Sequence, residues 1–202
     1  MAKLVFDWAD KDKWKYDITT HDQFKSYYTH IRAYHGCRTS DVSSYYSKGI
    51  MVPNESFIKS MLEELPGYFD ALRENFELDS YDKGIFFVAD KRHLLECCGH
   101  YMIYGSEIIA GVAVDLDGLT HERNMNYLKS IGKPTILTCD IPMSLVADVY
   151  LDCIAEAFIT SRPSNVYTGS LVTRSQLSPE FIVKHEHPRC IFDPLSSRNY
   201  EW

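Results

Sequence analysis

The sequence predicts an α+β domain, because short strand patterns alternate with longer helical ones. Gly84–Ala89 and Thr135–Asp140 are short apolar runs with the length and residue types of strands. Asn54–Leu65 and Met143–Ser161 instead repeat apolar residues at the spacing of an amphipathic helix. Hydrophobic residues make up 45% of the 202 residues, which is enough for one sizeable core.

The composition limits the classes of partner. A formal net charge of −7 argues against broad, non-specific affinity for nucleic acid, which needs clustered Lys and Arg. The six cysteines show no C-x-x-C spacing and no secretory signal is visible at residues 1–3, so we expect free thiols in a cytoplasmic protein. No apolar run approaches the length of a membrane-spanning helix, so we expect no membrane partner.

The chain divides into an N-terminal extension, residues 1–30, and a domain, residues 31–202. The extension alternates aromatic with charged residues and is expected to pack on the domain. Within it, Thr20-His21-Asp22 is predicted to cap a short helix over about Gln23–Tyr28.

Local signals place the other elements along the chain. In the first half these are a helix over 41–48 capped by Thr39 or Ser40 and ended by Gly49, a helix to about residue 65 capped by Asn54-Glu55-Ser56, an amphipathic segment over 68–76 and a polar turn over 79–83. A strand over 84–89, a long helix over 91–115 that Gly99 or Gly105 could break, a polar loop or short helix over 115–126 and a strand over 135–140 follow. The last elements are a helix over 143–161 ended by 162–164, strands over 166–175 and 181–187, and a peripheral tail over 191–202. The buried side of the helix over 143–161 is predicted to carry Leu145, Val146, Val149, Tyr150, Cys153, Ile154, Ala157 and Phe158.

Three polar residues share one face of the predicted long helix. Tyr101, Tyr104 and Glu107 are spaced three apart, which brings them to the same side. Glu107 stands among apolar residues, and an isolated buried charge is costly. Its carboxylate is therefore either hydrogen-bonded or functional.

His185-Glu186-His187 has the H-x-H spacing of some metal sites. No third ligand lies nearby in the sequence. We therefore interpret the two histidines as alternating, outward-facing residues near a strand end, and we predict no metal site.

Two segments carry a further pattern. The chain reads Y-H-G-C-R-T from Tyr34, then a short helix, then K-G-I up to Ile50, and it reads G-I-F-F-V-A from Gly84. At this spacing both segments resemble signatures of the ADP-ribosyltransferase superfamily, in particular its poly- and mono-ADP-ribosyltransferase branch.

The resemblance implies a fold and a function. The fold would be an ADP-ribosyltransferase-like, split antiparallel β-sheet flanked by helices, with a cleft for NAD. The function would be transfer of ADP-ribose from NAD to a macromolecular acceptor, either protein, RNA or DNA, with release of nicotinamide. A small protein with this core resembles bacterial or phage toxin and antiviral defence transferases, so an antitoxin or inhibitor protein is a candidate partner.

The resemblance also assigns roles within the first signature. His35 would hold a ribose hydroxyl of NAD, and Gly36 would bind the carboxamide of nicotinamide through its backbone. Arg38 would reach the pyrophosphate, since a guanidinium suits phosphate oxygens. Thr39 completes the NAD-binding signature.

The second segment would supply the walls for the nicotinamide ring. Phe86 matches the first of the family's two stacking aromatics. The second does not align directly, because an ungapped count reaches Cys97, so Tyr101 or Tyr104 is expected to take its place. Leu94 stands where the family has a small serine.

The chain departs from the family at its third signature, a glutamate at the head of a late strand. The corresponding position falls near Gly169. A carboxylate would stabilise the oxocarbenium-like transition state, so we predict that Glu107 supplies it, with His35 and Tyr104 as the other catalytic residues.

Three alternatives stay open. The enzyme could transfer only one ADP-ribose, with assistance from its substrate. Without the carboxylate, the domain could be a catalytically inactive module that binds a nucleotide or a partner. The RNA 2′-phosphotransferase branch shares the fold but uses several arginines for phosphate. Arg32, Arg38, Arg92 and Arg174 are the residues placed for that role.

Overall fold

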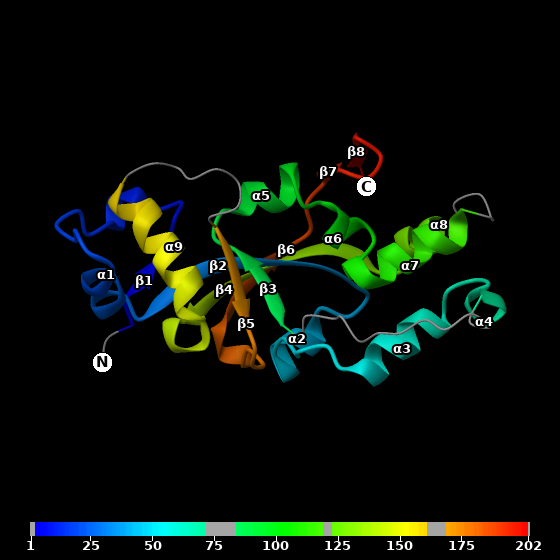
Figure 1. Ribbon diagram of the computed structural model, residues 1–202, viewed down its shortest axis with the longest axis horizontal. Coiled ribbons are helices and arrows are strands. Elements are labelled where there is room, and N and C mark those ends of the chain that lie inside the picture. The colour runs from blue at the N-terminus through cyan, green and yellow to red at the C-terminus, as the bar shows by residue number, and fades with distance from the viewer. Residues whose placement is uncertain (1–2, 72–83, 119–122, 161–168, 202) are drawn as a thin grey trace.

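A computed structural model of the chain describes residues 3–71, 84–118, 123–160 and 169–201 (Figure 1). These residues form a six-stranded sheet and a separate two-stranded hairpin. The main path of the sheet is β5-β3-β2-β4-β6, with antiparallel neighbours throughout, while β1 lies parallel to the start of β2. The predicted α+β class is therefore confirmed, and so is an antiparallel sheet.

The strands of the described residues include two long ones at the centre of the sheet. They are β1 (Val5–Phe6), β2 (His30–Thr39), β3 (Ile85–Val88), β4 (Lys133–Pro142), β5 (Ser170–Thr173), β6 (Ile182–Glu186), β7 (Cys190–Asp193) and β8 (Arg198–Glu201).

The helices of the described residues lie on both faces of the sheet. They are α1 (His21–Tyr27), α2 (Ser43–Lys48), α3 (Glu55–Glu63), α4 (Tyr68–Ala71), α5 (Lys91–Glu96), α6 (His100–Ile103), α7 (Glu107–Asp117), α8 (Arg123–Ser130) and α9 (Asp148–Ile159), with 3₁₀ turns at Lys11–Lys13, Met143–Leu145 and Pro179–Phe181. The turn predicted over 79–83 and the helix end predicted at 162–164 lie outside the described residues, as does most of the segment predicted over 68–76.

The sheet separates two clusters of buried apolar side chains. On what we term the first face, Ile31 and Ala33 of β2 pack with residues of α1 and α9, and Tyr45 of α2 adjoins them. On the second face, Tyr34 of β2 packs with residues of α3, α5, α6, α7 and α8. Successive side chains of a strand point to opposite faces, so the odd-numbered positions of β2 belong to the first face and the even-numbered ones to the second.

The first thirty residues contribute to the first-face cluster. Phe6 and Phe24 are almost fully buried there, at 1% and 0% exposure. Of the three predicted capping residues, Thr20 caps α1, whereas His21 and Asp22 already belong to the helix. The Thr20 hydroxyl accepts a hydrogen bond from the Gln23 amide, and the Gln23 side chain accepts one from the Thr20 amide. The N-terminal segment thus shares the core of the sheet.

The turn before α2 differs from the prediction. The Asp41 carboxylate, rather than Thr39 or Ser40, accepts hydrogen bonds from the amides of Ser43 and Ser44. Gly49 ends α2 with φ 81°, a conformation that favours glycine, as predicted.

The long helix predicted over 91–115 is broken at both Gly99 and Gly105 into α5, α6 and α7, while its third glycine, Gly111, lies inside α7. Gly105 adopts φ 87°, which ends α6 and turns the chain into α7. At Gly99, an added Cβ would lie 2.0 Å from the carbonyl oxygen of Phe192, so the C-terminal hairpin requires a glycine there. Tyr101, Tyr104 and Glu107 consequently lie on two helices, not on one face of a single helix.

The helix predicted from Met143 begins later, at Asp148. Met143–Leu145 forms a 3₁₀ turn, and Val146 then makes an isolated bridge to Thr173 of β5. Val149 and Cys153 are exposed, which contradicts the prediction, but Val146, Ile154, Ala157 and Phe158 are buried as predicted.

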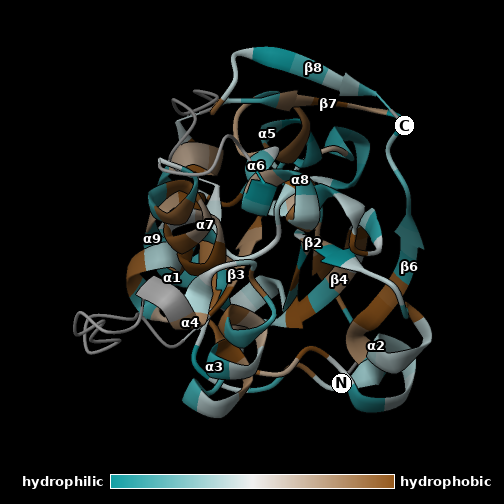
Figure 2. Ribbon diagram, turned by 90° about the vertical axis from the view of Figure 1, so that its right-hand side faces the viewer, coloured by the Kyte–Doolittle hydropathy of each residue, from teal (hydrophilic) through white to brown (hydrophobic). Residues whose placement is uncertain are grey.

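The tail forms the hairpin β7–β8, which covers α5 and α6 from outside. Ile191 is fully buried in the second-face cluster, whereas β8 is hydrophilic along its length, as Figure 2 shows. No helix among the described residues is both long enough and apolar enough to cross a lipid bilayer.

Candidate functional site

The sheet opens between β2 and β3 beside His35. β2 pairs with β4 over ten residues, from His30 to Thr39, but with β3 only at Tyr34, opposite Val88. β3 instead pairs along its length with β5. The edge of β2 that faces β3 therefore has no strand partner beyond Tyr34 among the described residues.

His35 lies at this opening as a neutral ring with its proton on Nδ1. Its Nδ1 lies 2.9 Å from the backbone oxygen of Phe86, across the gap. A carbonyl oxygen only accepts, so Nδ1 carries the proton and Nε2 is left as a hydrogen-bond acceptor. Burial lowers the pKa of His35, and the bond to Phe86 offsets only part of that effect, so the ring is neutral near pH 7.

Phe87 of the first face lies close to His35, and a phenol and a thiol follow further along β2. The ring of Phe87 lies 5.5 Å from the His35 ring, centroid to centroid. Tyr45 of α2 hydrogen-bonds with Cys37 and Thr39, further along β2. Burial raises the pKa of Cys37 to about 11, which keeps the thiol protonated and unreactive. The Thr39 hydroxyl also accepts from the Asp41 amide, so Thr39 serves the β2–α2 turn.

Gly36 is tightly covered on the second face. A Cβ at this position would lie 3.1 Å from Leu94 Cδ2 and 3.2 Å from Met102 Cγ. The missing side chain thus lets α5 and α6 approach the sheet. Leu94, which stands where the resembled family has a serine, fills that space with an apolar group.

Arg38 binds backbone carbonyls rather than facing an open site. Its guanidinium donates to the carbonyl oxygens of Lys129 and Ile131 at the end of α8, and to those of Met102 (3.4 Å) and Gly132 (3.3 Å). These contacts satisfy carbonyls that a helix C-terminus leaves without partners. The structure therefore gives Arg38 a structural role in joining β2 to α8.

Phe86 and the helical residues lie on the other side of the sheet from His35. Phe86 alternates with Ile85 and Phe87, which are buried on the first face, so its side chain, 44% exposed, points to the second. Because Met102 packs over Gly36, α6 with Tyr101 also belongs to the second face. The structure thus brings His35 next to the backbone, not the ring, of Phe86.

Tyr101, Tyr104 and Glu107 all have partners within the chain. The Tyr101 hydroxyl donates to the Glu107 carboxylate at 2.9 Å. Glu107 is exposed at the first turn of α7, where a negative charge suits the helix dipole. The buried Tyr104 donates to Asp193 of the C-terminal hairpin at 2.6 Å. Tyr104 therefore holds the hairpin against α6.

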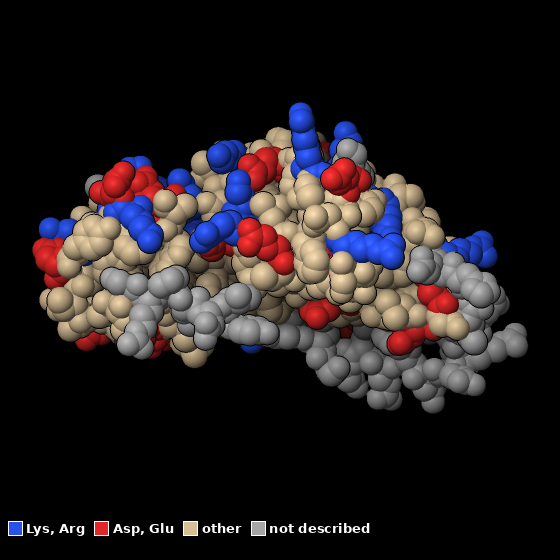
Figure 3. Space-filling model, turned by 90° about the horizontal axis from the view of Figure 1, so that it is seen from above, with Lys and Arg blue, Asp and Glu red and all other residues tan. Residues whose placement is uncertain are grey.

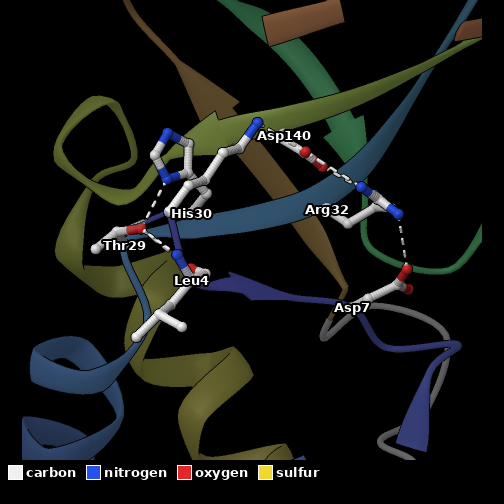
Figure 4. Close-up of polar contacts among 7 residues, drawn as sticks. Leu4, Asp7, Thr29, His30, Arg32 and Asp140 are labelled. Atoms are coloured by element: carbon white, nitrogen blue, oxygen red, sulfur yellow. Dashed lines mark hydrogen bonds and ion pairs between the residues drawn. The ribbon is translucent and has the colours of Figure 1, made fainter. Parts of the chain in front are cut away.

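A cluster of acidic and basic side chains beside β1 was not predicted from the sequence. Arg32 donates to both carboxylate oxygens of Asp140, at 2.8 and 3.1 Å, and to Asp7 at 3.3 Å (Figure 4). Lys3 adds a contact of 2.9 Å to Asp140. Burial alone would raise the pKa of Asp140, but the bonds from Arg32 and Lys3 outweigh it and hold the pKa below its usual value.

This cluster borders a cavity of about 310 Å³. The cavity is lined by Lys3, Leu4, Val5, Asp7, Asp10, Lys13, Tyr27, Tyr28 and Arg32. In the sequence, Arg32 is considered as a candidate phosphate ligand. Its pairing with two carboxylates could not be foreseen, because Asp140 lies 108 residues further along the chain.

Basic and acidic side chains are interspersed on the side that carries α5, α6 and the hairpin, as Figure 3 shows. Among the described residues, no group of three or more His, Cys, Asp and Glu side chains is arranged to hold a metal ion. Comparison of the chain with models of protein families, with curated proteins and with solved structures gives no match.

Proposed function

We propose that this chain transfers ADP-ribose from NAD to a macromolecular acceptor, protein or nucleic acid, and releases nicotinamide. The observation that carries the proposal is the neutral His35 at the opening between β2 and β3. The resemblance of the Y-H-G-C-R-T and G-I-F-F-V-A segments to ADP-ribosyltransferases supports it. The proposal includes that family's split-sheet fold, and a cytoplasmic setting with an inhibitor protein as partner.

His35 has the hydrogen-bonding state that ribose recognition requires. With Nδ1 protonated and held by the Phe86 carbonyl, Nε2 accepts a hydrogen bond from a ribose hydroxyl. The backbone edge of β2 at Gly36 adjoins the opening and suits the carboxamide of nicotinamide. Such contacts fix the sugar while the bond from its C1′ to nicotinamide breaks and an acceptor atom bonds to C1′.

The arginines argue against the phosphotransferase alternative. Arg38 is engaged by four carbonyl oxygens, and Arg32 by Asp140 and Asp7. Arg92 donates to Asp90 at the start of α5. Arg32, Arg38 and Arg92 are thus occupied within the chain.

One observation favours a binding module as the second candidate. Strand β5 begins at Ser170, directly after Gly169, so no carboxylate stands at the head of this late strand. Glu107 is exposed on the far side of the sheet from His35. A domain that binds NAD without cleaving it would need His35 but no carboxylate.

Measurement of nicotinamide release, together with NAD binding, tests both candidates. We expect His35→Ala to lower turnover by at least about 10²-fold, because the ribose loses its positioning contact. His35→Gln, which keeps a side-chain acceptor, should retain part of the activity. His21→Ala is the matched control, because His21 lies on α1 and contacts Asp152 and Glu156 of α9.

The outcomes separate the candidates. NAD binding that depends on His35, without release of nicotinamide, would replace the transferase with the binding module. Equal turnover in the wild type and in folded His35→Ala would remove His35 from the site. Absence of both binding and turnover in the wild type would exclude both candidates.

A further inference from the structure

Two exposed histidines lie side by side at the end of the edge strand β6. His185 belongs to β6 and pairs with Leu137 of β4, while His187 directly follows the strand and contacts Thr135, two residues from Leu137, so both rings lie on the same face of β4. Their ring centroids are 5.5 Å apart and the rings are inclined at 62°. Glu186, between them, points the other way and pairs with Lys91 at 2.7 Å.

The contacts of His187 fix its tautomer. Its Nδ1 lies 2.9 Å from the backbone oxygen of Pro134 and 3.2 Å from the Thr135 hydroxyl. The carbonyl oxygen accepts only, so the proton sits on Nδ1. Nε2 of the neutral ring therefore presents a lone pair, which is the state that binds a metal.

His185 has a matching contact through α2. Its Nδ1 lies 2.9 Å from the hydroxyl oxygen of Tyr46. A phenol oxygen accepts as well as donates, so it accommodates a proton on Nδ1 of His185 and frees Nε2. Both rings are thus supported at Nδ1 by a neighbouring element, β4 in one case and α2 in the other.

We propose that His185 and His187 bind one divalent transition-metal ion through their Nε2 atoms. Two imidazoles on one tetrahedral ion, with metal–nitrogen bonds of about 2.0–2.1 Å, place their ring centroids about 5 Å apart. The observed 5.5 Å is close to that spacing. Imidazole favours Zn²⁺, Cu²⁺ and Ni²⁺ over Mg²⁺ and Ca²⁺, which prefer oxygen ligands.

The site is an open one. No described group of three side chains could surround the ion, so water occupies its remaining positions. The structure adds to the H-x-H spacing what the sequence could not show, namely the ring separation and the Nδ1 partners. Through Tyr46, a bound ion would also tie β6 to α2, the helix that follows the His35 strand.

Titration of the full chain with Zn²⁺, followed by the ring nitrogen resonances of the histidines, tests this proposal. We expect the Nε2 resonances of His185 and His187 to shift together and to saturate at one ion per chain. His185→Ala and His187→Ala should each weaken this binding by at least about tenfold. Both residues are exposed, so both variants are expected to fold.

His21→Ala is the control, because its ring nitrogens already face carboxylates, and it should leave the binding unchanged. The six cysteines can also take up Zn²⁺, but such binding leaves these two ring resonances in place. Resonances that stay fixed, or a shift confined to one of the two rings, would overturn the shared site. Equal affinity in the wild type and either alanine variant would do the same.

Discussion

The two halves of β2 differ in the number of strands that hold them. From His30 to Tyr34, the closed half, the strand pairs with β4 on one edge and with β1 or β3 on the other. From His35 to Thr39, the open half, only β4 pairs with it among the described residues. The ten-residue strand β2 thus has strand partners on both edges in its first half and on one edge in its second half.

The polar side chains of the two halves have different hydrogen-bonding and ion-pair partners. In the closed half, Arg32 is neutralised by Asp140 and Asp7. In the open half, Arg38 is engaged by carbonyl oxygens, whereas His35 keeps a ring nitrogen that can accept from a ligand. Strand pairing and tertiary contacts, more than residue type, decide which polar group is available for chemistry.

Asp140→Asn removes the central anion of the closed half, and we expect it to cause the largest loss of stability. The carboxylate is buried, at 5% side-chain exposure, and its loss leaves Arg32 and Lys3 without their main anion. Breaking a buried ion pair typically lowers the free energy of unfolding by about 3–5 kcal/mol. Because both cations are partly exposed, we expect a loss at the lower end, about 3 kcal/mol. Urea denaturation measures it.

Asp148→Asn is the matched control, because Asp148 is 84% exposed and pairs with Lys25 at the surface. Such a pair contributes about 1 kcal/mol or less. The lowered pKa of Asp140 adds a pH dependence. Its contribution is complete above the ordinary aspartate pKa and is lost as the pH falls through the lower folded value, and this loss should be absent in Asp140→Asn. Equal destabilisation by both variants would contradict the assignment.

The sequence predicts well where a signal is local. Thr20 and Gln23 form their capping box within four residues, and Gly49 ends α2, so both features could be foreseen. The break at Gly99 depends on Phe192, which is 93 residues away, and the engagement of Arg38 depends on carbonyls at the end of α8. Contacts of this kind leave no local signal.

The candidate site shows the same limit. The resemblance predicts that His35 and Phe86 belong to one site, and strand alternation would separate their side chains only if the strand register were known. The register comes from pairing with β4 and β3, which a single sequence does not contain. Val149 and Cys153 are predicted to be buried but are exposed, because the side of α9 that packs on the core is set by tertiary contacts that a single sequence does not contain.

Gly36→Ala tests whether the glycine of the open half serves packing. The new Cβ would press on Leu94 and Met102 at 3.1 and 3.2 Å, so we expect a loss of about 1 kcal/mol of unfolding free energy. Leu94→Val shortens the side chain that is met first. The loss of unfolding free energy in the double variant should therefore be smaller than the sum of the losses in the two single variants.

Gly111→Ala provides the control in the same assay. Gly111 lies inside α7, and an added Cβ would meet nothing within 4 Å. Alanine should there stabilise the protein by about 0.5–1 kcal/mol, as expected for a helix interior. If Gly36→Ala leaves stability unchanged while NAD binding or turnover falls, the glycine serves the ligand rather than the packing of α5 and α6.

Glu107→Gln should have the smallest effect, and it tests how far the site extends beyond the open half. Glu107 is exposed, begins α7 and accepts from Tyr101, so its amide should change the unfolding free energy by no more than about 0.5 kcal/mol. Since Met102 packs over Gly36 on the second face, the sheet separates this carboxylate from the His35 ring, and nicotinamide release should stay near the wild-type rate. A fall of about 10²–10³-fold, with stability preserved, would be the size expected for a lost electrostatic contact at the transition state. That result would bring the second face into the catalytic site and support the carboxylate role predicted from the sequence. Release near the wild-type rate would instead mean that any transfer at His35 proceeds without Glu107, as the placement of the two residues on opposite faces leads us to expect.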